Sequence, residues 1–166
     1  MLGIDFNSGA ICGALNPNSQ DAVDFAHKEY DTIRKDRYDI YKIAKNTSYN
    51  VETILTIKKY LFIDKHKLEN EFIRFDPDPH IAWSWIRLRN GHILPHDLIL
   101  LKHELEEIKY MRQGYSQALA HDYATKKYDY SSAAQKWSET LKFRKGKLER
   151  KENNELNFNN EYYFKR

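Results

Sequence analysis

Two neighbouring segments with helical periodicity, separated by a glycine, constrain the fold of this chain most strongly. Between Pro95 and Met111, apolar side chains recur at three- and four-residue steps, which is the period of an amphipathic helix. Pro95 suits the first turn of a helix, where its missing N–H costs no hydrogen bond, and Gly114 can take the positive φ that ends one. Ser116 suits the N-cap of a second helix. Residues 95–130 are therefore predicted to form a helix pair.

Similar patterns cover most of the remaining chain. Helices are predicted from Ser19 with a break near 35–37, from Asn50 through Phe62, from Asp78 and Pro79 to Gly91, and from Ser131 or Ser132 onward. The β-branched residues between Val51 and Ile57 leave a strand open there, but their spacing favours a helix. Residues 64–78 are predicted to be a connector with room for a short helix.

The expected fold is therefore all-α, a single compact domain of about six helices over residues 19–150. Residues 1–18 hold three of the six glycines and a proline, which predicts a short irregular N-terminal arm or a strand pair, the only strand expected. Residues 151–166 form an Asn-rich tail. No apolar run approaches the roughly 18 residues of a membrane span, and the single Cys12 excludes an internal disulfide framework.

Charge gives a weak indication of an anionic partner. Lys and Arg number 27 against 24 Asp and Glu, a net charge of +3. The excess is local, because residues 142–151 carry a dense group of lysines and arginines. This basic stretch can bind nucleic acid, although such stretches are more often the solvated end of a helix.

The sequence H-E-x-x-E on the central helix carries the strongest candidate chemistry. His103 and Glu107 are four residues apart and share a helix face, and Glu104 follows His103 directly. The pattern differs by one residue from the H-E-x-x-H of zinc peptidases, whose histidines bind metal while the glutamate acts as a base. His121 on the next helix is the candidate third ligand for one divalent metal ion, with zinc preferred. The alternative for Glu107 is a solvated face with i,i+4 pairs.

Two further residues are candidates for catalysis. His66 lies in a polar connector and can act as a general acid or base near neutral pH; otherwise it is simply an exposed histidine. Arg87 follows two tryptophans and can clamp a phosphate or carboxylate, or else pair with Asp76 or Asp78. The candidate catalytic set is therefore His66, Arg87, His103, Glu104 and His121.

Several strings of the sequence resemble a known domain. They are GALNPNS, DFAHKEYDTIRK, YDIYKIAKNT, IKKYLFIDKH, FDPDPHIAWSWIRL and LLKHELEEIKYMRQGYSQALAHDYATKKYDY, which together span about residues 13–135. This set resembles the C-terminal domain of minor head (capsid morphogenesis) proteins of phages of Gram-positive bacteria. It is also similar to C-terminal effector domains of polymorphic toxins.

The resemblance implies an interchangeable effector module that is carried by a phage head or a secreted-toxin scaffold. Such modules act on nucleic acid, nucleotide or protein in the cytoplasm of a recipient cell, and toxins of this kind need an immunity protein. The implied site residues are His66, Arg87, His103, Glu104, Glu107 and His121. Because Glu107 replaces the second histidine of H-E-x-x-H, ordinary zinc-peptidase membership is in doubt.

Three functions remain open on the sequence. The first is a toxin-type hydrolase, foremost a nuclease, in which histidines and glutamates supply acid–base or metal-assisted chemistry and Arg87 holds the phosphate. The second is a non-enzymatic structural or adaptor module of a phage head, with a location in the virion. The third is a metallopeptidase-like toxin with about one zinc ion per chain.

Overall fold

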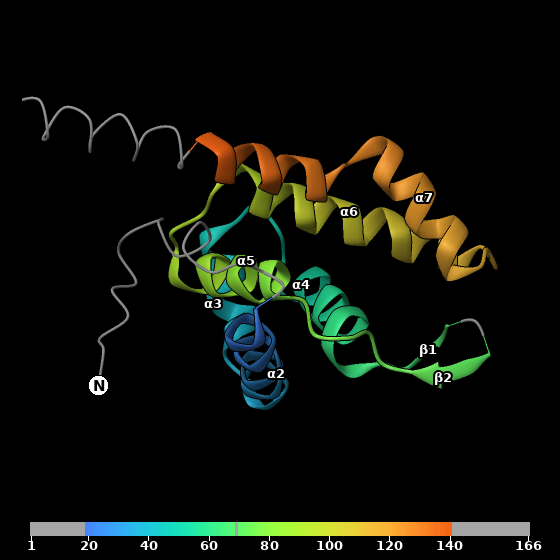
Figure 1. Cartoon of the computed structure of the whole chain (residues 1–166), viewed down its shortest axis with the longest axis horizontal. Coiled ribbons are helices and arrows are strands. Elements are labelled where there is room, and N and C mark those ends of the chain that lie inside the picture. The colour runs from blue at the N-terminus through green and yellow to red at the C-terminus, as the bar shows by residue number, and fades with distance from the viewer. Residues whose placement is uncertain (1–18, 69, 141–166) are drawn as a thin grey trace, which may run out of the picture.

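The computed structural model describes residues 19–68 and 70–140, and these form a compact helical domain (Figure 1). The helices are α2 (Gln20–Lys35), α3 (Asp39–Asn46), α4 (Val51–Lys58), the π-helix η1 (Lys59–Ile63), α5 (Pro79–Asn90), α6 (Pro95–Arg112) and α7 (Gln117–Lys127), and residues 130–140 are helical as well. The all-α prediction is confirmed. The N-terminal arm, the basic stretch 142–151 and the Asn-rich tail lie outside the described residues.

The predicted helix boundaries follow from local capping. The side chains of the N-cap residues accept hydrogen bonds from backbone N–H groups of the first turn at Ser19, Asn50, Asp78 and Ser116. Gly91 and Gly114 take positive φ values of 78° and 89°, as expected where a chain leaves a helix. The break near 35–37 is also present, because α2 ends at Lys35 and α3 begins at Asp39.

The helix predicted through Phe62 changes its hydrogen-bond pattern part-way. α4 ends at Lys58 and continues as η1, so the strand considered for Val51–Ile57 is wrong. The Lys58 ammonium is buried and donates to Asp39 Oδ1 at 2.7 Å and to the Asp36 carbonyl. Single π-helical turns are uncommon and often occur at functional sites. Here the turn carries Tyr60, which is buried against α6.

The connector 64–78 contains an antiparallel hairpin and no helix. β1 (His66–Leu68) pairs with β2 (Glu71–Ile73), with His66 opposite Ile73 and Leu68 opposite Glu71. The expectation that the N-terminal arm would hold the only strand is therefore wrong. The strands are too short for an alternating pattern to be visible, and tertiary contacts hold them, since the His66 ring packs between Tyr60 and Phe75.

The core lies between α2, α3, α4, η1, α5 and α6. Trp85 at its centre is fully buried, makes an edge contact with Phe62, and donates its indole N–H to Asp39 Oδ2 at 3.0 Å. α7 packs along α6, and the two helices form a layer over the rest of the domain (Figure 1). The hairpin projects from the same end of the domain as the turn between α6 and α7, and β1 contacts α7.

Candidate metal centre

Helix α6 buries an unusual number of ionisable side chains. Six of its residues with polar or charged side chains are buried: His96, Asp97, His103, Glu104, Glu106 and Glu107. Burying such groups is costly unless each has a hydrogen-bond partner, an ion partner or a bound metal. Arg87 of α5 binds His96 and Asp97, whereas η1, α7 and the residue after α7 supply partners for His103, Glu106 and Glu107.

His103, Glu107 and His121 meet as a triangle of ligand atoms, as the sequence predicted. Glu107 Oε2 lies 3.2 Å from His103 Nε2 and 2.9 Å from His121 Nδ1, and the two ring nitrogens are 3.3 Å apart. The spacing resembles one face of a zinc tetrahedron, where ligands about 2.0–2.1 Å from the ion stand about 3.3 Å from one another. The cluster has the geometry of a group that could hold a metal ion.

The orientation of His103 is set by a backbone carbonyl. Its Nδ1 lies 2.8 Å from the carbonyl oxygen of Tyr128, just beyond the end of α7. A carbonyl oxygen can only accept, so Nδ1 carries the proton and donates it. In the neutral ring, Nε2 then presents a lone pair toward Glu107 and His121. This arrangement, with one nitrogen donating to the protein and the other free, is typical of metal-binding histidines.

Glu107 is held by two donors on its outer oxygen. Tyr60 from η1 donates its hydroxyl to Oε1 at 2.6 Å, and Gln117 from α7 donates its amide at 3.0 Å. The other oxygen, Oε2, is left to face the two histidines. Burial raises the pKa of Glu107, but a proton held between Oε2 and the two histidines, together with the hydrogen bond from Tyr60, outweighs it and lowers the pKa to about 2. The carboxylate is therefore ionised at neutral pH.

The electrostatics of the triangle favour a cation within it. A charged carboxylate oxygen and the lone pair of His103 face each other at 3.2 Å, which is repulsive unless a proton or a metal ion lies between them. The hydrogen bond to Glu107 raises the pKa of His121, so in the metal-free protein a proton occupies part of this space. The side chain of His121 is 56% exposed, which leaves a route from solvent.

Glu104 lies beside the triangle, in the position that the base occupies in H-E-x-x-H. It is buried, and burial raises its pKa well above the ordinary value, with the charge of Glu107 adding to the effect. A carboxyl group with a raised pKa can exchange protons near neutral pH.

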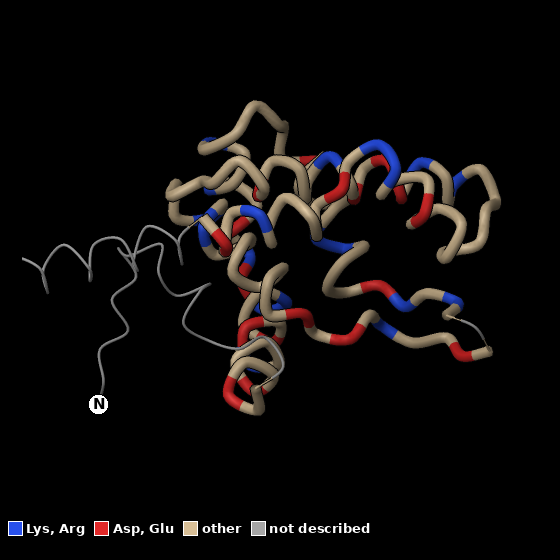
Figure 2. Tube along the Cα trace, turned by 45° about the horizontal axis from the view of Figure 1, so that its top comes forward, with Lys and Arg blue, Asp and Glu red and all other residues tan. Residues whose placement is uncertain are grey.

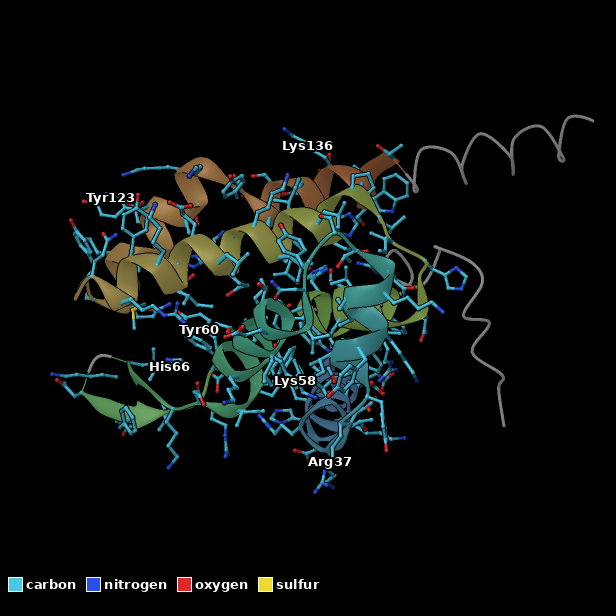
Figure 3. The ribbon with its side chains drawn as sticks, turned by 180° about the vertical axis from the view of Figure 1, so that it is seen from behind. Arg37, Lys58, Tyr60, His66, Tyr123 and Lys136 are labelled. Carbon is cyan, nitrogen blue, oxygen red and sulfur yellow. The ribbon has the colours of Figure 1, made fainter. Side chains whose placement is uncertain are left out.

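His66 is placed differently from the prediction that it is exposed. It is buried at the base of the hairpin, where its Nε2 is 2.8 Å from the Tyr60 carbonyl and its ring stacks on Phe75. Figure 3 shows Tyr60 and His66 together beneath α6. The Tyr60 ring contacts His66 while its hydroxyl binds Glu107, so Tyr60 stands between His66 and the triangle.

Arg87 belongs to a separate network at the corner between α5 and α6. Its guanidinium binds both oxygens of Asp97, at 2.9 Å from Nε and 2.6 Å from Nη2, and Nη2 also donates to Ser84. The carboxylate that binds Arg87 here is Asp97, whereas the alternative considered from the sequence was Asp76 or Asp78. Asp97 further accepts from the N–H of Leu94 at 2.8 Å, so the pair fixes the start of α6.

Two residues of the site were not predicted from the sequence. Tyr60 and Gln117 both bind Glu107 Oε1, from positions 47 and 10 residues away. Tyr60 reads as an ordinary apolar position of a helix, and the π-helical turn that places it has no sequence signature. Gln117 lies in the first turn of α7, where its direction depends on how α7 packs on α6.

Comparisons with known proteins do not assign this chain to a family. Neither the family models, nor the curated proteins, nor the solved structures contain a significant match to this chain. Among the described helices, none has both the length and the apolar character needed to cross a membrane.

Proposed function

We propose that this chain is a metal-dependent hydrolase whose ion is bound by His103, Glu107 and His121, and that it acts as an effector domain of the kind its sequence resembles. The observation that carries the proposal is the triangle of ligand atoms with edges of 2.9–3.3 Å, formed by two helices. Two histidines and one glutamate are a common ligand set for catalytic zinc, which keeps its fourth position open for water.

The residues around the triangle support this role. His103 is oriented by the Tyr128 carbonyl, and Glu107 is oriented by Tyr60 and Gln117. Such outer hydrogen bonds are typical of built metal sites, because they fix the ligand atoms before the ion arrives. A bound zinc ion would supply a Lewis acid and lower the pKa of a water molecule. Glu104, which follows the ligand His103 in the H-E-x-x-E string, is the candidate base for that water.

The two alternative functions, a metal-free acid–base enzyme and an adaptor module, account for fewer of the observed contacts. A metal-free acid–base mechanism gives no reason for three ligand atoms to converge on one point. An adaptor module gives no reason for Glu104 and Glu107 to be buried side by side, which costs free energy. Nucleic acid as the substrate stays a prediction, because the basic stretch 142–151 lies outside the described residues. An immunity protein and delivery to a recipient cytoplasm stay predictions as well.

Zinc binding tests the proposal directly. Purified full-length protein, stripped with a chelator and reloaded, should bind about one zinc ion per chain, measured by calorimetry and elemental analysis. His103→Ala and His121→Ala should each lose this binding while keeping the helical circular dichroism spectrum. His27→Ala is the matched control, because His27 is an exposed histidine on α2. Equal zinc binding by all four proteins would overturn the proposal.

Growth of a bacterial host tests the effector role. Tightly induced wild-type protein should arrest growth, while His103→Ala should not, and analysis of RNA, DNA and protein in the arrested cells should identify the damaged molecule. Normal growth with a zinc-loaded wild-type protein inside the cells would argue against a toxic effector and leave only the hydrolase.

A further inference from the structure

A hollow beside the proposed metal centre has the chemistry of a peptide-binding groove. It has a volume of about 1040 Å³ and lies between the hairpin and the turn that joins α6 to α7. Its walls include Lys67, Leu68, Ile73, Phe75, Tyr115 and Gln117. Most of these side chains are apolar or aromatic, and Ile73 and Tyr115 remain 41% and 42% exposed.

The groove connects to the triangle through two residues. Gln117 lines the groove and donates to Glu107 Oε1 at 3.0 Å. On the hairpin side, β1 begins at His66, which binds the carbonyl of Tyr60, and the hydroxyl of Tyr60 donates to the same Oε1 atom. Both donors that orient the metal ligand Glu107 therefore sit on, or next to, the walls of the groove.

The hairpin offers unpaired backbone to a ligand. In the described part of the chain, β1 and β2 pair only with each other, so each keeps one free edge of N–H and C=O groups. An extended peptide can add to such an edge as a further strand, with main-chain hydrogen bonds giving affinity and side-chain pockets giving specificity. Glu71 and Ile73 of β2 line the groove, whereas Phe72 between them lies outside its described lining and is 66% exposed.

The charge of this region does not suit a nucleic acid. Within the described lining of the groove, Lys67 and Glu71 are the charged residues, and their charges cancel. Figure 2 shows acidic and basic residues interspersed over α6, α7 and the hairpin, without a stripe of one sign. Nucleic-acid sites need clustered Lys and Arg to neutralise phosphates, whereas an apolar, near-neutral groove suits the side chains and amides of a peptide.

We infer that the hydrolase acts on polypeptides, bound in extended form between the hairpin and the turn from α6 to α7. This inference rests on the proposed metal-dependent hydrolase and names its substrate class. In the reaction, the oxygen of water bonds to the carbonyl carbon and the C–N bond breaks. One proton of the water passes to the leaving nitrogen, so the products are a carboxylate and an amine.

The test uses zinc-loaded full-length protein and a library of short unstructured peptides that carry a fluorophore and a quencher, with single-stranded RNA and DNA in parallel. We expect cleavage of a subset of the peptides and of neither nucleic acid. Methylating backbone nitrogens of a cleaved peptide, away from the cleaved bond, should raise KM about tenfold or more, because the added strand loses its donors.

A pair of variants on one strand tests the groove itself. Ile73→Asp places a charge in the groove and should raise KM about tenfold or more with kcat within about twofold of wild type. Phe72→Asp is the matched control, because Phe72 is the adjacent residue, lies outside the described lining of the groove and is 66% exposed. Its KM should stay at the wild-type value, and zinc affinity should be unchanged in both variants.

The outcomes separate this inference from the proposed function. Zinc binding with cleavage of RNA or DNA and of no peptide would overturn the peptide inference and leave the hydrolase. Zinc binding with no cleavage of any peptide would overturn it as well, as would equal effects of Ile73→Asp and Phe72→Asp. Absence of zinc binding would instead remove the proposed function on which the inference rests.

Discussion

The Tyr60 hydroxyl donates a 2.6 Å hydrogen bond to Glu107 Oε1, joining a π-helical turn to a helix 47 residues further along the chain. The bond fixes which oxygen of Glu107 faces His103 and His121. A change at Tyr60 therefore alters the proposed metal centre without removing any ligand. Dependence on a residue that is not itself a ligand distinguishes a metal site with oriented ligands from three polar side chains that meet by chance.

Replacing Tyr60 with phenylalanine should weaken zinc binding about 10- to 100-fold, the usual effect of losing an outer-shell hydrogen bond. The apolar ring remains, so its contacts with His66 and Phe75 should persist. Competition against a chelator of known affinity measures the change. Tyr41→Phe is the control, since Tyr41 is 57% exposed on α3. If the two variants bind zinc equally well, Tyr60 does not orient Glu107.

Zinc affinity should rise with pH and level off above the pKa of His121. The hydrogen bond that His121 donates to Glu107 raises that pKa above its ordinary value near 6.5, so the ion must displace a proton from His121 in weakly acidic and neutral solution. Glu107, with a pKa of about 2, is already ionised throughout this range. Calorimetry in buffers of different ionisation enthalpy would report the proton released. Zinc affinity that is constant from pH 5.5 to 8.5 would contradict the assignment of His121 as a ligand.

The stability of the metal-free protein should change with pH in the opposite direction to zinc affinity, falling as the pH rises. A histidine with a raised pKa stabilises the fold fully below its unfolded pKa, and this contribution is lost as the pH rises through the folded value. The thermal midpoint of chelator-treated protein should therefore fall slightly between weakly acidic and alkaline pH. His121→Ala should flatten this part of the profile, whereas His27→Ala should leave it unchanged.

Glu104→Gln should keep the zinc ion and lose hydrolysis. The amide has nearly the same shape as the carboxyl group but cannot accept a proton from water, and a positioned acid–base group contributes about 10²–10⁴-fold to rate. Rate and zinc content are measured on the same preparation. Glu106→Gln is the matched control, because Glu106 pairs with Lys109 and Lys127 and does not reach the triangle. A Glu104→Gln variant with the wild-type rate would remove Glu104 from the mechanism.

Lys58→Met should destabilise the fold by about 3–5 kcal/mol, the usual cost of leaving a buried charge without its partner. Asp39 is fully buried and its Oδ1 accepts from Lys58 at 2.7 Å. Urea unfolding followed by circular dichroism measures the loss. Lys59→Met changes the adjacent, exposed lysine and should stay within about 0.5 kcal/mol of wild type. Similar midpoints for both variants would show that the Trp85 indole and the Ile40 backbone N–H satisfy Asp39 without Lys58.

Local chemistry explains why much of the fold could be predicted. The N-caps at Ser19, Asn50, Asp78 and Ser116 act within one helical turn, so their effect is visible in four or five residues of sequence. The hairpin could not be predicted, because three-residue strands carry no pattern. They depend on the His66 ring lying between Tyr60 and Phe75, which only the packed structure specifies.

The candidate site likewise has a part that the sequence predicts and a part that depends on packing. His103 and Glu107 share a face because they are four residues apart, and a helix pair turning at Gly114 brings His121 back toward them. The donors to Glu107 Oε1 depend instead on the π-helical turn and on the packing of α7. The sequence offered Asp76 or Asp78 as one alternative partner of Arg87, whereas the corner between α5 and α6 brings Asp97 to it.

The ligand atoms of the triangle come from α6 and α7, and a third segment, η1, orients Glu107. An extended chain therefore has no preformed metal site, and the free energy of zinc binding becomes available only once these three segments have folded together. A protein that left its producer in unfolded form would be chemically silent during transit. For the proposed effector, activity would then appear only on refolding in a compartment that supplies zinc, so folding at the destination would set when it starts to act.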